Sequence, residues 1–166
     1  NFSDEQSPFL FYTHKDQKDI VVRKIELYDG ATPSPNAVMA FNLNYLGIIF
    51  DEQSWRLQSI EMLRSVFNAI KKYPTSFSVW AGIYLIQTAG INEIVITGQH
   101  IQEIVNEVLV EYIPNKVLQS NTEENEMPLL EKKQYKKDAL IYLCRDYSCK
   151  EPLTKVSELL NTIKNT

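Results

Sequence analysis

The spacing of the apolar residues changes near residues 89–90, and this change constrains the fold more than any other feature of the chain. Before it, three segments carry apolar residues at helical spacing, over residues 34–50, 52–73 and 76–88. After it, residues 93–97 form a short β-branched run of the kind found in buried strands. The sequence therefore predicts an α+β chain with two domains, a helical one over residues 1–90 and a small α/β module over residues 91–166.

The first domain is expected to begin with a β-hairpin. Residues 9–13 and 19–27 have strand-like composition, and the charged segment 14–18 separates them. After this hairpin, Ser34 can cap a helix that has Pro35 at its first position, where a missing N–H costs nothing.

The helix over residues 34–50 carries two apolar stripes, so burial on two sides is expected. The helix over residues 52–73 has one apolar face and ends at Pro74. The helix over residues 76–88 is apolar enough to predict that neighbours enclose it. These three helices are expected to form an antiparallel layer.

The second domain is predicted as a three-stranded α/β module. Strands 93–97 and 116–119 flank an amphipathic helix over residues 101–112, which makes a β-α-β unit with a right-handed crossover. The polar segment 120–137 is expected to be an exposed connection. A third strand over residues 139–143 and a closing helix near residues 153–163 complete the module.

Composition excludes several classes of partner. The net charge of the 166 residues is −4, which argues against a nucleic-acid-binding surface. No apolar run approaches the length of a membrane-spanning helix, and no signal peptide is visible in the first residues. No cofactor is expected. The two cysteines leave the redox compartment open, with the cytoplasm slightly favoured.

Five polar residues around residues 23–36 are the candidate ligand-binding residues. Asp29, Ser34 and Asn36 can line a polar cavity, and Arg23 and Glu26 precede them as ligand-binding or acid/base groups. The alternative is structural: turn and capping chemistry explains Asp29, Ser34 and Asn36, and a surface ion pair explains Arg23 and Glu26. No catalytic residue can be assigned.

Cys144 and Cys149 are the candidate redox or structural thiols. Four residues separate them, which is not the Cys-x-x-Cys spacing that lowers a thiol pKa, so a local disulfide or a structural thiol pair is favoured. No metal is expected, because a zinc site needs about four ligands and the two histidines lie far away in sequence. Gly98 precedes a helix and could support anion binding, although a tight turn is the simpler interpretation.

Four separated motifs carry a resemblance to a known family. They are YDGATPSPN (residues 28–36), IVITG (94–98), YIPNKV (112–117), and YLC (142–144) with Cys149 and Pro152. With these motifs, most of the chain resembles the C-terminal part of the YyaL-like, spermatogenesis-associated, thioredoxin-domain-containing proteins.

The resemblance implies an upstream thioredoxin-like domain followed by an (α/α)6 toroid similar to N-acylglucosamine 2-epimerases and six-hairpin glycosidases. This chain would then supply the last toroid helices and a small α/β tail, and its partners would be the upstream domain and the remainder of the toroid. The toroid would bind or transform a carbohydrate-like small molecule. The alternative is a non-catalytic scaffold or interaction module. Alone, the fragment is expected to be inactive and able to form a homodimer through uncovered apolar surface.

Overall fold

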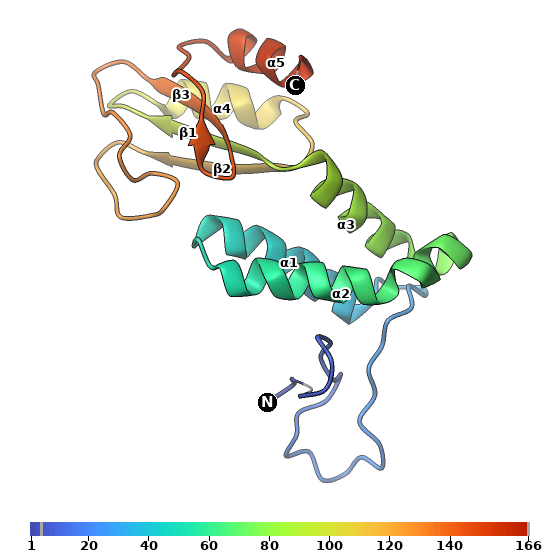
Figure 1. Cartoon of the computed structure of the whole chain (residues 1–166). Coiled ribbons are helices and arrows are strands. Elements are labelled where there is room, and N and C mark those ends of the chain that lie inside the picture. Colours follow the sequence, from blue (N-terminus) through green and yellow to red (C-terminus); the bar gives the residue numbers. More distant parts are fainter. Residues whose placement is uncertain (4, 166) are drawn as a thin grey trace. The chain divides into compact units, whose positions relative to one another are not determined.

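The computed structural model describes residues 1–3 and 5–165, and this part of the chain has a mixed α+β architecture (Figure 1). The chain divides into two compact units, Asn1–Thr88 and Ala89–Thr166. No helix of the described residues has both the length and the hydropathy needed to cross a membrane.

The helices of the first unit follow the sequence prediction closely. Helix α1 spans Pro35–Ile49, α2 spans Gln53–Lys72 and α3 spans Ser78–Ala89. Ser34 caps α1 as expected, because its Oγ accepts a hydrogen bond from the N–H of Ala37 at 3.3 Å. One difference is local: a single 3₁₀ turn, η1 (Pro74–Phe77), joins α2 to α3.

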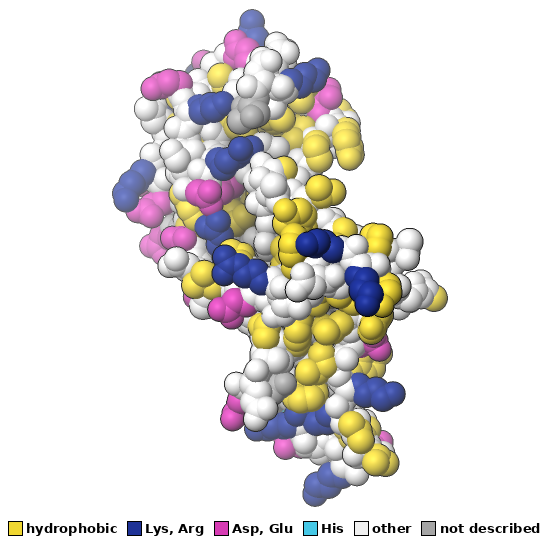
Figure 2. Space-filling view, turned by 45° about the vertical axis from the view of Figure 1, so that its right-hand side comes forward, with side chains coloured by type: hydrophobic (Ala, Val, Ile, Leu, Met, Phe, Trp, Pro, Cys, Tyr) yellow, Lys and Arg dark blue, Asp and Glu magenta, His cyan; other side chains and the backbone are white. Residues whose placement is uncertain are grey.

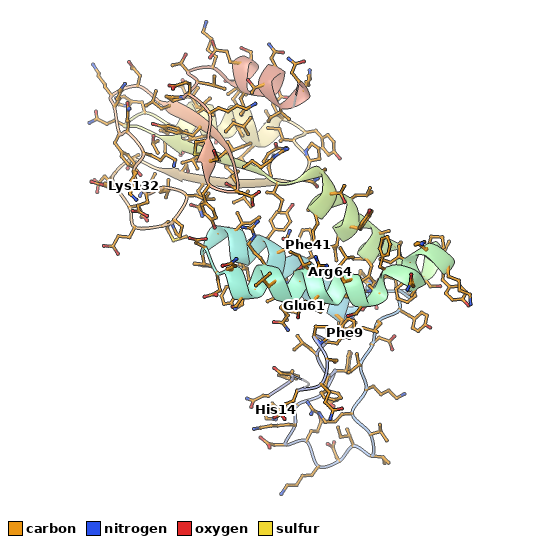
Figure 3. All side chains as sticks on the ribbon, in the orientation of Figure 1. Phe9, His14, Phe41, Glu61, Arg64 and Lys132 are labelled. Carbon is orange, nitrogen blue, oxygen red and sulfur yellow. A yellow bond between two sulfur atoms is a disulfide. The ribbon has the colours of Figure 1, made fainter. Side chains whose placement is uncertain are left out.

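The core of the first unit lies where the helices meet the N-terminal segment. Trp80 of α3 is fully buried, and Phe9 of the N-terminal segment packs against it edge to face, with ring centroids 6.2 Å apart. Phe9 lies where this segment approaches the helices (Figure 3). The other buried members of the core are Ala37, Ala40, Met62, Leu63, Val66, Ile70, Phe77 and Ile83.

In the described part of the chain, helix α1 is buried mainly along one side and exposes several large apolar side chains, whereas burial on two sides was expected. Its buried positions are Asn36, Ala37, Ala40, Asn44, Gly47 and Ile48. Small residues permit close approach of α2, whose Ser59 hydroxyl donates to the carbonyl oxygen of Ala40 at 2.6 Å. Large apolar side chains of α1 are instead exposed, namely Val38, Met39, Phe41 and Leu46. Hydrophobic side chains gather at the surface of the helical unit (Figure 2).

Helix α3 is also less enclosed than predicted. Trp80 and Ile83 are buried, but Tyr84 is 41% exposed and Leu85 is 65% exposed. In the described part of the chain, Tyr84 contacts the Phe67 ring at a centroid distance of 5.3 Å, and Leu85 remains largely open to solvent.

The predicted N-terminal β-hairpin is wrong. Among residues 1–3 and 5–34, only the isolated bridge between Ser3 and Leu10 has strand-type pairing. One backbone bond, from the N–H of Tyr12 to the carbonyl oxygen of Lys24, joins the two predicted strands. Several of their other backbone groups, including the N–H and carbonyl of Leu10 and the carbonyl of Glu26, bond to side chains instead.

The second unit contains the predicted β-α-β arrangement. Strands β1 (Asn92–Thr97) and β2 (Lys116–Asn121) pair in parallel, and helix α4 (Gln102–Val110) connects them. Strand β3 (Leu140–Arg145) pairs antiparallel with β1 on its other side. Helix α5 spans Val156–Lys164.

The sheet has one strand more than predicted. Within the described residues it is four-stranded with the order β2-β1-β3-β4, because the two-residue strand β4 (Ser148–Cys149) folds back onto β3. A strand this short gives no periodicity to read from sequence. Buried apolar residues of β1, β3, α4 and α5 form the core on one side of the sheet, including Ile94, Ile96, Val108, Ile141, Leu143, Val156 and Leu159.

Candidate functional site

Asn36 holds the N-terminal segment on helix α1. Its side chain is buried, with 2% exposure. The amide Nδ2 donates to the carbonyl oxygens of Leu10 and Glu26, both at 3.0 Å, and Oδ1 accepts from the N–H of Leu10 at 2.8 Å. The side-chain amide therefore acts as a backbone partner for two separate stretches of chain.

Ser34 and Asp29 fix the turn that leads into α1. Beyond its capping bond, Ser34 donates through Oγ to the carbonyl oxygen of Glu26 at 3.0 Å. Asp29 accepts from the N–H of Ser34 at 2.9 Å and from the N–H of Val79 at 2.8 Å. The Asp29 carboxylate thus lies at the N-terminal ends of α1 and α3 together, where the helix dipoles favour negative charge.

Arg23 and Glu26 occupy different surroundings. The Arg23 guanidinium donates to the carbonyl oxygens of Thr13 and Asn1 and lies 3.9 Å from the centroid of the Phe11 ring. Glu26 is exposed, and its Oε1 accepts from the N–H of Tyr28 at 3.2 Å. No ion pair between Arg23 and Glu26 is found among the described residues.

A cavity of about 310 Å³ lies beside two of the predicted site residues, Glu26 and Asn36. It opens between the N-terminal segment and the start of α1. Its other lining residues are Phe2, Leu10, Phe11, Tyr12, Pro35 and Met39. The structure thus brings Glu26 and Asn36 to one cavity, whereas Arg23, Asp29 and Ser34 are not among its lining residues.

The aromatic lining of this cavity was not predicted from the sequence. Phe11 and Tyr12 come from the predicted hairpin, where aromatic residues indicate strand formation as readily as a binding site, and Phe2 precedes that hairpin. The available signal was the cluster of aromatic residues within the first twelve positions.

A second cavity, of about 440 Å³, lies at the start of α4 in the second unit. Its lining is Gln99, His100, Ile101, Gln102, Glu103 and Thr122. Gly98 precedes it with φ +135°, and a Cβ at this position would lie 2.7 Å from the carbonyl oxygen of Asp138. The positive φ and the close approach of Asp138 therefore explain why a glycine occupies this tight turn.

Cys144 and Cys149 form a disulfide. They are direct cross-strand partners in the β3–β4 pair. The connecting residues Asp146 and Tyr147 both have positive φ, at 48° and 61°, as a two-residue type I′ hairpin turn requires. Of the two alternatives left open by the spacing, the structure has the local disulfide.

Glu93 of β1 anchors the same turn and was missed in the sequence. It is 1% exposed, and its two carboxylate oxygens accept from the N–H groups of Asp146 and Tyr147, both at 2.9 Å. The signal was a lone acidic residue in a buried β-branched run, since a buried charge requires such partners. No cluster of three or more His, Cys, Asp or Glu side chains suited to a metal ion is present in the described residues.

Comparison with known proteins gives distant relatives of much greater length. The human protein named spermatogenesis-associated protein 20 is 28% identical over 142 residues, which cover 79% of this chain and 18% of the human protein. The chain has homologues of that name. Those from rat and mouse are each 26% identical over 152 residues, covering 85% of this chain and 19% of the relative.

This chain therefore spans less than a fifth of the length of the curated relatives that it matches. No protein-family model matches the chain, and no solved structure matches it.

Proposed function

We propose that this chain is the C-terminal part of a longer protein whose helical toroid binds or transforms a carbohydrate-like small molecule. In this proposal a thioredoxin-like domain precedes the toroid, and α1, α2 and α3 are its last helices. The four sequence motifs and the greater length of the homologues support the proposal. The uncovered apolar residues of α1 support it as well, because further helices of a toroid would bury them.

The single observation that carries the ligand proposal is the cavity beside Glu26 and Asn36. Aromatic rings can stack on the apolar faces of a sugar, and a carboxylate can accept hydrogen bonds from its hydroxyl groups. Phe2, Phe11 and Tyr12 provide the rings, and Glu26 provides the carboxylate. The cavity volume of about 310 Å³ lies at the lower end of the range for small-molecule sites.

A panel of neutral mono- and disaccharides tests this proposal by thermal shift and by ¹H–¹⁵N NMR. Met39→Trp places a larger side chain in the lining of the cavity, so we expect it to abolish any binding that the wild type shows. Val38→Trp is the matched control, because Val38 is the exposed neighbour of Met39 and does not line the cavity. Binding by none of the sugars, or binding that survives Met39→Trp, would contradict a carbohydrate site here.

The second candidate is a non-catalytic scaffold that supports the thioredoxin-like domain. The observation that favours it is the bonding of Asp29, Ser34 and Asn36, whose side chains are all engaged with backbone groups of this chain. Polar groups used in this way fix loops and helix starts and are less available to a ligand. In a full-length protein, intact cellular function of Met39→Trp would favour the scaffold over the ligand-binding toroid.

A further inference from the structure

The cavity beside Glu26 carries one charged side chain among its described lining residues. Leu10, Pro35 and Met39 give it apolar walls, and Phe2, Phe11 and Tyr12 add aromatic rings. Glu26 and Asn36 are the polar members besides the Tyr12 hydroxyl. The chemistry of the ligand therefore depends on which of these polar groups still has hydrogen-bonding capacity for a ligand.

Asn36 has little capacity left for a ligand. Both N–H groups of its amide are directed at carbonyl oxygens, and its oxygen accepts from the N–H of Leu10. A ligand that displaced these bonds would also release Leu10 from helix α1. Asn36 therefore shapes the wall of the cavity and does not select the ligand.

Glu26 retains most of its accepting capacity. A carboxylate can accept about four hydrogen bonds, and one is used by the N–H of Tyr28. Ser34 and Asn36 both donate to the backbone carbonyl of Glu26, so the backbone that carries this side chain is fixed beside the cavity. A charge-assisted hydrogen bond from a cationic donor is the strongest contact that this group can make.

The neighbouring rings favour a cation as well. The faces of aromatic rings attract cations, and the Arg23 guanidinium already lies over the Phe11 ring at 3.9 Å. Arg23 donates to the carbonyl oxygens of Thr13 and Asn1 and is thereby committed to the N-terminal segment. Phe2 and Tyr12 are the other rings that line the cavity, and Phe2 also contacts the His14 ring edge to face at a centroid distance of 5.5 Å.

We propose that this cavity binds a small organic ammonium ion. The protonated amine lies at the Glu26 carboxylate beside the rings of Phe2 and Tyr12, and the apolar body of the ligand lies against Leu10, Pro35 and Met39. The inference rests on the proposed function only in that the same cavity receives a small molecule. It adds a charge requirement that a neutral sugar does not meet.

Three probes of similar shape and different charge test this inference. They are 2-phenylethylammonium, 2-phenylethanol and phenylacetate, titrated separately into the ¹⁵N-labelled 166-residue chain and followed by NMR at neutral pH. We expect the ammonium probe to bind in the millimolar range and to shift the backbone signals of Tyr12, Glu26 and Met39. The alcohol should bind about fivefold more weakly, and the acid more weakly still, because a fivefold ratio is of the order of one cation–π or charge-assisted contact.

Two variants identify the groups responsible. Glu26→Gln keeps an oxygen for the N–H of Tyr28 but removes the charge. It should therefore lower the affinity for the ammonium probe about fivefold and leave the affinity for the alcohol unchanged. Glu61→Gln on the exposed side of α2 is the matched control, because Glu61 does not line the cavity (Figure 3). Tyr12→Leu is an independent variant at a position that is 67% exposed. It should lower the affinity for the ammonium probe more than the affinity for the alcohol.

The possible results separate this inference from the proposed function. Equal binding of the ammonium and alcohol probes, or an ammonium affinity unchanged in both Glu26→Gln and Tyr12→Leu, would overturn the ammonium site. Neutral sugars that bind and are lost in Met39→Trp would then still support the carbohydrate proposal. Binding of the ammonium probe without any sugar binding would support this inference and contradict the carbohydrate proposal. Failure of all three probes would overturn the inference.

Discussion

Asn36 and Leu10 form a reciprocal pair of hydrogen bonds although 26 positions separate them in the sequence. The Asn36 Oδ1 accepts from the N–H of Leu10 at 2.8 Å, and its Nδ2 donates to the carbonyl oxygen of Leu10 at 3.0 Å. A side-chain amide thus provides the two bonds that a neighbouring strand would otherwise give to this residue. The pair explains how the N-terminal segment is held on a helix without forming a sheet.

Replacing Asn36 with Ala should destabilise the first unit strongly. The change leaves the N–H and carbonyl of Leu10 and the carbonyl of Glu26 without this partner, and we expect a loss of about 2–4 kcal/mol in the free energy of unfolding. Urea denaturation followed by tryptophan fluorescence measures it, since both tryptophans, Trp55 and Trp80, lie in this unit. Asn42→Ala, at an exposed position on the same helix, should change stability by less than about 0.5 kcal/mol.

Replacing Glu93 with Gln should loosen the β3–β4 turn. An amide offers one oxygen where the carboxylate offers two, so one of the N–H groups of Asp146 and Tyr147 loses its hydrogen bond to residue 93. We expect a loss of about 1–3 kcal/mol in the second unit. Hydrogen exchange at the amides of Asp146 and Tyr147 should accelerate. Exchange as slow as in the wild type would mean that Glu93 does not hold the turn.

Reduction of the disulfide should destabilise the second unit only moderately. The Cys144–Cys149 bond closes a short loop, and the chain-entropy relation gives about 2 kcal/mol for a loop of this length. The double variant Cys144→Ser, Cys149→Ser should reproduce the effect without a reductant. Denaturation of the reduced, oxidised and double-variant proteins makes the comparison, and alkylation with mass spectrometry verifies the thiol state of each sample.

Stability should fall in alkaline solution partly because of Tyr45. Burial raises the pKa of its hydroxyl above the usual value of 10.0. Above pH 10 the unfolded chain therefore releases this proton while the folded chain still holds it, and unfolding becomes more favourable as the pH rises through the raised pKa. Tyr45→Phe should lose less stability than the wild type between pH 10 and pH 11. Parallel pH profiles of the two proteins would contradict this explanation.

The exposed apolar residues of α1 should promote self-association of the isolated chain. Phe41 and Leu46 are exposed on this helix, and removal of their apolar surface from water favours association. Sedimentation velocity should show dimers or larger species whose fraction rises with concentration and falls in the double variant Phe41→Ser, Leu46→Ser. Val21→Ser is the control, because Val21 is fully exposed on the N-terminal segment away from this helix. A monomer at all concentrations would contradict the expectation.

The five helices and the strands β1, β2 and β3 could be predicted from sequence because each has a local signature, which the two-residue strand β4 lacks. Ser34 with Pro35 marked the start of α1, Pro74 marked the end of α2, and the β-branched run marked β1. The N-terminal segment was misread because the decisive partner of Leu10 is a side chain far along the sequence. Alternation of apolar residues cannot distinguish a strand from an extended segment that side chains hold in place.

The candidate site was predictable only in part. Glu26 and Asn36, two of the five candidate residues, line a cavity, and a ligand-binding role for them stays a prediction. Of the rings that line the same cavity, Phe11 and Tyr12 come from the predicted hairpin and Phe2 precedes it. The Asn36–Leu10 bonds hold this segment on α1. The buried side of α1 could not be predicted from the sequence either. It faces α2, where the Ser59 hydroxyl contacts the carbonyl oxygen of Ala40.

The carbonyl oxygen of Glu26 receives two hydrogen bonds, from Ser34 and from Asn36, and both act on the backbone. The position is therefore held whatever side chain it carries. Substitution at residue 26 could alter the charge at the mouth of the cavity while its walls stay in place. In homologous chains that keep Ser34 and Asn36, one substitution at position 26 would thus change the ligand preference at little cost in folding stability.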